Sequence, residues 1–573
     1  MELEKLIQAA QGLVRADLLL TRCQLVNVFT GEIQNTDVAV AGGWVVGVGP
    51  GYAAERVLDL NGGYLCPGLI NAHVHVESSM VVPTEFARAV VPHGTTTAVT
   101  DPHEIANVCG LAGIRYMLDA GSQAPMSILA MAPSCVPATH MSTAGASLNA
   151  VDLQALRDDP RVLGLAEMMN FPGVLMGQSD VLDKLRAFAG RPMDGHAPGL
   201  HGRSLNAYVA AGIGSDHECI TADEALEKLR LGMRVLIREG STARNLGALL
   251  PAARLNPSAS RRCSFCTDDR HPAELLDEGD IDALVRGAIA AGLDPITAIQ
   301  MATLNPAEWF DLHDRGAVAP GRRADLVAFS DLYDFRPDLV MVAGRIVAQA
   351  GQMTVDSKMI QVDDAVVRSS VRVCSDSLDL RIPAVGRAIR VIGAAGDQLL
   401  TEHRIVEATV QDGLAVADAA RDLAKMAVIE RHHGTGRVGL GFVSGMGFQR
   451  GALATTVCHD HHNLLVIGVD DRSMMTAIRA VVEMGGGEVV ARRDQVVQAL
   501  PLPVAGLMSD RPVEQVRRDQ EAMLLAAASL GCRLHDPFMT ASFLALEVIP
   551  ALKLTDQGLV DVNQFKLVDL WVD

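Results

Sequence analysis

The chain has 573 residues, is 49% hydrophobic and carries a formal net charge of −19. A chain of this length is too long for one compact core, so we expect two or three domains. The acidic balance argues against a nucleic-acid partner, because binding to a phosphate backbone requires a basic surface. The longest apolar stretches are strand-sized or are broken by Gly, Pro and charge, so no membrane partner is expected.

The N-terminus and the cysteines indicate the compartment. Met1-Glu2-Leu3-Glu4 lacks the basic start and apolar core of a signal peptide, so we expect a cytoplasmic protein. The ten Cys have no framework spacing and are expected to be reduced thiols. Cys263 and Cys266 form a CxxC, but in a strand the two thiols would face opposite sides, so we assign them no chemistry.

The first predicted elements are short strands separated by Gly-containing turns, at 16–20, 26–28, 36–40 and 44–48. A similar pattern returns at 325–329 and 339–342. We expect these two pieces to pair into a small β-sandwich. Residues 1–65 would hold an N-terminal helix and the first half, and residues 316–360 the second half.

Strand and helix signals alternate in residues 66–315, between the sandwich halves. Eight candidate strands end near His75, Asp101, Cys135, Glu167, His196, His217, Glu239 and Asp268. Eight such repeats predict an α/β fold of the (β/α)8-barrel type, in which catalytic residues lie at the C-terminal ends of the strands.

The pattern changes beyond about Asp356, where residues 361–573 are expected to form a further α/β domain. Strands are predicted at 378–380, 389–392, 405–408, 438–443, 464–469 and 488–492. Helical spacing is predicted at 416–431, 473–484 and 513–529.

Metal-binding side chains lie at the ends of the predicted barrel strands. His73 and His75 are two residues apart in a strand, so both imidazoles point to one face and can hold one metal ion. Later strands end at the remaining members of the set, Glu167, His196, His217 and Asp268. Four imidazoles and two carboxylates suit two divalent ions, and Glu167 can bridge them through its two oxygens. Asp268 can bind one ion and accept a proton from a water that the ions acidify.

Four strings carry a family resemblance: residues 67–79, 100–108, 265–270 and 500–509. On these strings the chain resembles the amidohydrolase superfamily and, over nearly its whole length, the bacterial adenine deaminase family within it. The resemblance implies a metallo-dependent hydrolase barrel with an adenine-deaminase-type C-terminal domain. It also implies a centre of two manganese, iron or zinc ions, and conversion of adenine and water to hypoxanthine and ammonia in purine salvage. Many superfamily members carry a carboxylated lysine on the fourth strand, where this chain has Glu167, as the family pattern expects. We further expect a homo-oligomer, taken as a dimer.

Several residues allow two interpretations. Asp101 and His103 are either a further metal contact or orienters of a ligand histidine, or else a helix cap followed by a solvated imidazole. Glu218 is expected to carry protons between the purine ring and the leaving amine, and the alternative is a surface carboxylate. Arg238 could frame the substrate pocket or be structural.

The string at 457–463 is unusually dense in metal-binding groups. If it is extended, His459 and His461 share one face and Asp460 and His462 share the other. A ligand role and a lid over the barrel mouth both stay open.

Two other functions compete with the deaminase. A cyclic-amide hydrolase of the hydantoinase or dihydroorotase type would use the same metals, but it should lack the string at 101–107 and the long last domain. A non-catalytic scaffold would have lost metal ligands, and all six are present. The sequence leaves open the native metal, the oligomeric state and the residues that read the purine edge.

Overall fold

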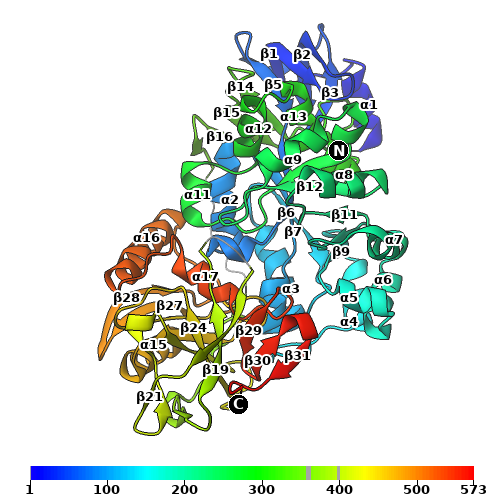
Figure 1. Cartoon of the computed structure of the whole chain (residues 1–573). Coiled ribbons are helices and arrows are strands. Elements are labelled where there is room, and N and C mark those ends of the chain that lie inside the picture. Colours follow the sequence, from blue (N-terminus) through cyan, green and yellow to red (C-terminus); the bar gives the residue numbers. More distant parts are fainter. Residues whose placement is uncertain (1, 356–362, 397–399, 573) are drawn as a thin grey trace.

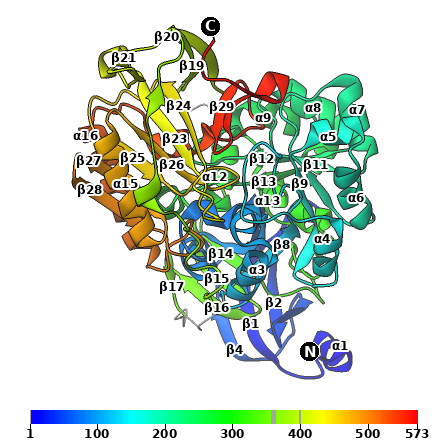
Figure 2. The same cartoon turned by 90° about the horizontal axis from the view of Figure 1, so that it is seen from below.

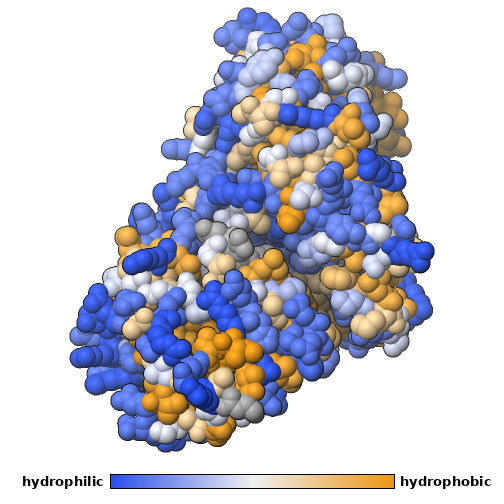
Figure 3. Space-filling view, viewed as in Figure 1, coloured by the Kyte–Doolittle hydropathy of each residue, from blue (hydrophilic) through white to orange (hydrophobic). Residues whose placement is uncertain are grey.

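The computed structural model describes residues 2–355, 363–396 and 400–572. Figure 1 shows three parts: a β layer that contains the N-terminus, a central region of strands and helices, and a C-terminal region on the opposite side. Hydrophilic residues cover most of the face in Figure 3, and apolar residues gather there over the C-terminal region around β19 and β24. None of the described helices is long and apolar enough to cross a membrane.

The N-terminal β layer is one nine-stranded sheet built from both ends of the first 355 residues. The first group of strands is β1 (Ala16–Asn27), β2 (Glu32–Ala41), β3 (Trp44–Val48), β4 (Ala54–Asp59) and β5 (Tyr64–Pro67). The second group is β14 (Leu326–Phe329), β15 (Pro337–Val342), β16 (Arg345–Gln349) and β17 (Gln352–Met353). β14 pairs antiparallel with β5, so the two predicted pieces meet in this sheet. The two strands expected at 16–20 and 26–28 are one strand with a bulge between Leu20 and Cys23.

The central region contains all eight predicted barrel strands. They are β6 (Leu69–Val74), β7 (Thr95–Thr100), β8 (Ser127–Ala132), β9 (Val162–Met168), β10 (Met193–Gly195), β11 (Ser215–Asp216), β12 (Arg234–Arg238) and β13 (Cys263–Cys266). The first five form a parallel sheet and the last three form another.

Backbone hydrogen bonds join the two sheets at both edges. Asp268 donates to the carbonyl of His73 at 3.0 Å, and His75 donates to the carbonyl of Asp268 at 3.2 Å. At the other edge, Gly214 donates to the carbonyl of Met193 at 3.0 Å. The eight strands therefore form a ring, and the predicted (β/α)8 barrel is confirmed.

The barrel interior is filled by one inward residue from most strands, namely Ala72, Val99, Met131, Ala166, Leu236 and Cys266. Cys263 packs outside the ring, so the two thiols do face opposite sides as expected. All ten Cys are free.

Helices cover the outside of the barrel. They include α2 (Pro83–Val90), α3 (His103–Gly121), α4 (Ala150–Arg157), α5 (Phe171–Met176), α6 (Ser179–Ala187), α7 (Gly202–Ala210), α8 (Ala222–Arg230), α9 (Leu246–Ala253), α12 (Ile281–Ala290) and α13 (Pro295–Ala302). Figure 2 shows α4 to α8 on the outer side of β9, β11 and β12.

The C-terminal region is built on an eight-stranded sheet in the order β20-β19-β24-β23-β26-β25-β27-β28. Its strands are β19 (Ala388–Gly393), β20 (Glu402–Glu407), β23 (Ala424–Ile429), β24 (Val438–Ser444), β25 (Ala452–Thr455), β26 (Leu464–Gly468), β27 (Gly487–Arg492) and β28 (Gln495–Pro501). Its helices are α15 (Asp471–Met484), α16 (Val513–Ser529) and α17 (Pro537–Phe543). A small sheet of β29 (Leu552–Thr555), β30 (Gly558–Asp561) and β31 (Lys566–Val568) follows.

Two predictions for this region are wrong. The helix expected at 416–431 is instead strand β23, preceded by a short 3-10 turn at Ala419–Arg421. Every residue of β23 is buried, including Lys425, so the strand has no exposed–buried alternation that would distinguish it from a helix. The strand expected at 378–380 is absent, since no strand is assigned there. The domain boundaries given above, at residues 65, 315 and 360, stay predictions.

β10 and β11 are the two shortest strands of the barrel. A buried ion-pair cluster stabilises the barrel beside them. Lys228 of α8 lies 2.8 Å from an Asp216 carboxylate oxygen and 3.1 Å from a Glu224 oxygen. Its ammonium also donates to the carbonyl of Ala197 at 3.0 Å, and Asp216 accepts the Ala197 amide at 2.8 Å. The cluster thus connects the segments that follow β10 and β11.

Lys228→Met should therefore destabilise the protein strongly. It keeps the stem but leaves two buried carboxylates without their cation, a change that typically costs about 3–5 kcal/mol. The free energy of urea unfolding measures this loss. Exposed Lys566→Met is the control and should stay within about 0.5 kcal/mol of the parent. Equal stability of the two variants would contradict a structural role for Lys228.

Candidate metal centre

The histidine pair lies where β6 ends. The Nε2 atoms of His73 and His75 are 3.2 Å apart, and the two rings are nearly perpendicular, at 86°. His75 Nδ1 lies 3.0 Å from the backbone carbonyl of Asp101, to which it can donate. That bond leaves Nε2 as the metal-binding nitrogen, which is how a second contact usually orients a ligand histidine.

Glu167 lies between two groups of imidazoles at the end of β9. Its Oε1 is 3.2 Å from His75 Nε2. Its Oε2 is 2.6 Å from His196 Nδ1 and 3.3 Å from His217 Nε2. The two oxygens thus face different histidines, which is the geometry that a bridging carboxylate needs.

Asp268 follows β13 and faces the histidine pair. Its Oδ1 lies 3.3 Å from His73 Nε2 and 3.1 Å from His75 Nε2. Its backbone has a φ of +57°, a left-handed conformation that Asp and Asn tolerate better than most residues. This turn directs the carboxylate back toward the barrel axis.

The structure thus brings all six sequence-predicted ligands together. One group is His73, His75, Glu167 and Asp268, and the other is Glu167, His196 and His217. Within these groups, sets of three ligand atoms lie within 4.8 Å of one another, including His73, His75 and Glu167. Imidazole and carboxylate donors are those that zinc, manganese and ferrous iron accept, so the donor set fits divalent transition metals.

The charges around Glu167 are mutually compensating. Burial raises the pKa of this carboxyl, but His196 and His217 outweigh burial and hold it well below its usual value. Burial lowers the pKa of His217, and Glu167 reverses this and raises it to about 9. A buried carboxylate here requires positive charge nearby, and metal cations can take the place of the imidazole protons.

Arg238, at the end of β12, links the two residues predicted to transfer protons. Its guanidinium bonds both oxygens of Glu218, and its Nη1 lies 2.6 Å from Asp268 Oδ2. Glu218 is only 6% exposed and lies 3.5 Å from His217 Nε2, so the surface-carboxylate alternative is wrong. The sequence alone could not decide whether Arg238 frames the pocket or is structural, because an adjacent Arg and Glu do not show which way either side chain points.

Asp101 and His103 lie at the centre and are not a helix cap. His103 is 2% exposed, and its Nδ1 is 3.1 Å from Asp101 Oδ2 and 3.5 Å from Glu167 Oε1. The N-cap of α3 is Pro102, without a side-chain capping bond. The alternative of a cap followed by a solvated imidazole is therefore wrong.

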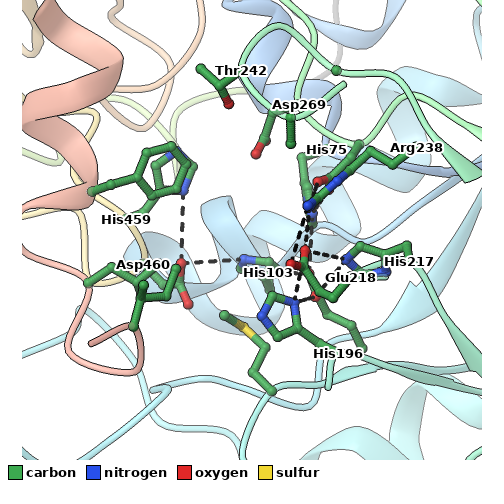
Figure 4. A pocket seen from close by; sticks show the side chains of 18 of the residues that line it. His75, His103, His196, His217, Glu218, Arg238, Thr242, Asp269, His459 and Asp460 are labelled. Carbon is green, nitrogen blue, oxygen red and sulfur yellow. Dashed lines mark hydrogen bonds and ion pairs between the residues drawn. The ribbon is translucent and has the colours of Figure 1, made fainter. Parts of the chain in front are cut away.

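The C-terminal region forms one wall of the pocket above these ligands. Figure 4 shows His459 and Asp460 across the pocket from His217, Glu218 and Arg238. The pocket encloses about 500 Å³, counting its open mouth. The string at 457–463 is a turn and not extended, so the predicted face sharing is wrong: His459 and His462 both reach Glu104.

Sequence reasoning missed several residues that line this pocket, namely Glu104, Met169, Thr242, Asp269, Phe543 and Leu546. Glu104 could have been found, because it follows His103 directly. Phe543 carried no local signal: its helix α17 is separated from the barrel strands by more than the length of a domain, and it stacks on His459 with ring centroids 4.7 Å apart.

Comparisons with known proteins agree with the barrel fold. Residues 64–347 match the Amidohydrolase family, and the chain is an amidohydrolase of that class. Residues 398–566 match the Adenine deaminase C-terminal domain. The adenine deaminase of Desulfatibacillum aliphaticivorans is 50% identical over 570 residues, 99% of each chain. Adenine deaminase 2 of Carboxydothermus hydrogenoformans is 48% identical over 99% of each chain. The chain therefore belongs to the adenine deaminase family.

A solved structure of an adenine deaminase also aligns, with a TM-score of 0.45 and 19% identity. It covers 58% of this chain and 99% of that one. A likeness at this level has no bearing on individual site residues.

Glu167→Gln should reduce the number of divalent ions bound per chain and abolish turnover. Glutamine keeps the size of the side chain but not the charge that would hold two cations together. Metal quantification by mass spectrometry after desalting measures the effect. Glu239→Gln is the matched control, since Glu239 directly follows barrel strand β12 and its carboxylate accepts the Leu246 amide, at 3.0 Å, away from the six ligands. If Glu167→Gln binds and turns over like the control, another group bridges.

Proposed function

We propose that this chain is an adenine deaminase, which hydrolyses adenine to hypoxanthine and ammonia. The observation that carries the proposal is the convergence of His73, His75, Glu167, His196, His217 and Asp268 on one point, in a chain that shares half of its residues with adenine deaminases over its whole length. The match to the Adenine deaminase C-terminal domain favours this activity over cyclic-amide hydrolysis. The complete ligand set favours an enzyme over a scaffold.

The cofactor we propose is a pair of divalent ions, manganese, iron or zinc. His73, His75 and Asp268 would hold one ion, His196 and His217 the other, and Glu167 both. When bound, such ions acidify water and make hydroxide available near neutral pH. The orientation of the donors is set by the chain, through the bond between His75 and the Asp101 carbonyl.

Proton transfer is assigned to Asp268 and Glu218. In the reaction, a C6–O bond forms, a ring nitrogen gains a proton, and the C6–N bond breaks as the amine takes up a proton and leaves as ammonia. The water supplies both protons: Asp268 would accept one as the C6–O bond forms and the other as the C6 hydroxyl becomes a carbonyl, and Glu218 or Asp268 would deliver one to the ring nitrogen and one to the departing amine. Arg238 contacts both carboxylates and so keeps them on the same side of the pocket.

The pocket suits a small uncharged purine. Met169, Phe543 and Leu546 give it apolar surface, and Glu218 and Asp268 give it acceptors at one edge. Among its described lining residues, Arg238 is the one Arg or Lys side chain, and its charge already faces two carboxylates. A nucleotide phosphate therefore has no available Arg or Lys side chain there. The homodimer and the cytoplasmic location remain sequence-based predictions.

Asp268→Asn should lower ammonia release from adenine by roughly a hundredfold, as for a lost general base. The amide oxygen can still bind a cation, and Asn tolerates the positive φ, so bound metal should be largely retained. Asp311→Asn is the control, because Asp311 is exposed and has a similar φ of +55°. A loss of only a few fold would transfer the base role to Glu218 or to solvent.

Adenine should be strongly preferred over adenosine, AMP and cytosine when ammonia release is compared at equal concentrations. The ribose on N9 of adenosine would clash with a pocket that encloses the purine and would leave polar groups unpaired. Ring opening of hydantoin and dihydroorotate is measured in parallel. Faster ring opening than deamination would assign the chain to the cyclic-amide hydrolases, and comparable turnover of adenosine would refute the preference for the free base.

A further inference from the structure

A second group of metal-binding side chains lies on the far side of His103 from Glu167. We call it the interface cluster: His103, Glu104, His459 and Asp460. The first two begin helix α3 of the barrel, and the last two lie in the turn between β25 and β26. All four side chains are at most 4% exposed. The cluster is therefore a buried polar contact between the barrel and the C-terminal region.

One donor atom from each residue faces a common point. His103 Nε2 lies 3.3 Å from Glu104 Oε1 and 3.8 Å from Asp460 Oδ1. His459 Nδ1 lies 2.8 Å from Glu104 Oε1 and 3.9 Å from Asp460 Oδ1. Four ligands placed about 2.1 Å from a tetrahedral ion stand about 3.4 Å apart, which is close to the mean of these separations.

Neighbouring residues orient the nitrogen and the carboxylate for this role. Asp101 Oδ2 lies 3.1 Å from His103 Nδ1 and can accept its proton, so the lone pair of His103 is on Nε2, facing the cluster. His462 Nδ1 accepts the Cys458 amide at 3.2 Å, so His462 carries its proton on Nε2 and donates it to Glu104 Oε2. Ligand histidines and ligand carboxylates are commonly held by such contacts.

Asp460 is the residue that ordinary hydrogen bonding does not explain. It is 3% exposed, and its Oδ2 has no hydrogen-bond partner among the described residues. Its Oδ1 is 3.8 and 3.9 Å from the nearest imidazole nitrogens, which is beyond hydrogen-bond range. A buried carboxylate without donors is costly, and protonated imidazoles at these distances would not satisfy it.

We infer that the interface cluster is a third metal site, which binds one divalent transition ion such as zinc, manganese or ferrous iron. Two imidazole nitrogens and two carboxylate oxygens suit these ions. The double positive charge balances Glu104 and Asp460. The ion would be additional to the pair at Glu167, and it would fix the C-terminal wall of the pocket to helix α3.

The test counts ions in the full-length protein. The chain is stripped with a chelator, reloaded with Mn²⁺ or Zn²⁺, desalted and analysed by mass spectrometry. The double variant His459→Ala/Asp460→Asn should bind one ion fewer per chain than the wild type. His433→Ala should bind as the wild type does, because the His433 ring lies at the same interface but outside the cluster, where it hydrogen-bonds to the Ala144 carbonyl at 3.1 Å. Equal metal content of the double variant and the wild type would overturn the inference.

A second measurement does not depend on the variant folding. Crystals of the loaded wild type should show an anomalous peak at the metal edge between His103 Nε2 and His459 Nδ1. Peaks confined to the centre at Glu167 would overturn the inference. Ammonia release from adenine is measured on the same wild-type sample, so that a failure of the proposed function is seen separately from the ion count.

Discussion

The buried carboxylate of Glu167 is the group on which the rest of the site depends. It is 2% exposed and lies among imidazoles from several different strand ends. A carboxylate in such a place requires positive charge and hydrogen-bond donors, and the barrel supplies both by directing the ends of its strands to one axis. His73 and His75 come from the first strand, His196 and His217 from later ones. The centre can bind metal because the fold surrounds the negative charge of Glu167 with imidazoles, which are also metal ligands.

The pocket is completed only where the two regions of the chain meet. Phe543 and His459 stack at 9° and face the barrel mouth, so the C-terminal region determines the shape of the space above the proposed ions. Further contacts hold this wall in place: the Val513 amide donates to Glu85 of α2 at 3.1 Å, and Arg88 pairs with Glu514 at 2.8 Å. A cation in the interface cluster would add to these contacts at the point nearest the substrate. The shape of the substrate pocket then depends on how the C-terminal region docks on the barrel.

Most of the barrel and its ligands could be predicted from the sequence, because both depend on local periodicity. His73 and His75 share a face through the two-residue period of a strand, and the helix predicted at 513–529 matches α16. The errors have equally physical causes. Strand β23 is buried on both faces and so has no alternation, and the turn at 457–463 does not follow the strand periodicity assumed for it.

By itself, the sequence determined the order of strands in the barrel and the identity of the six converging side chains. These follow from hydrophobic patterning and from the rule that parallel strands end at one face of a barrel. Only the tertiary structure decided that Arg238 joins Glu218 to Asp268, that His103 lies between two carboxylates, and that His459 and Asp460 reach helix α3. Those contacts join residues up to several hundred positions apart, and no local pattern encodes a distance between side chains that the packing of two regions brings together.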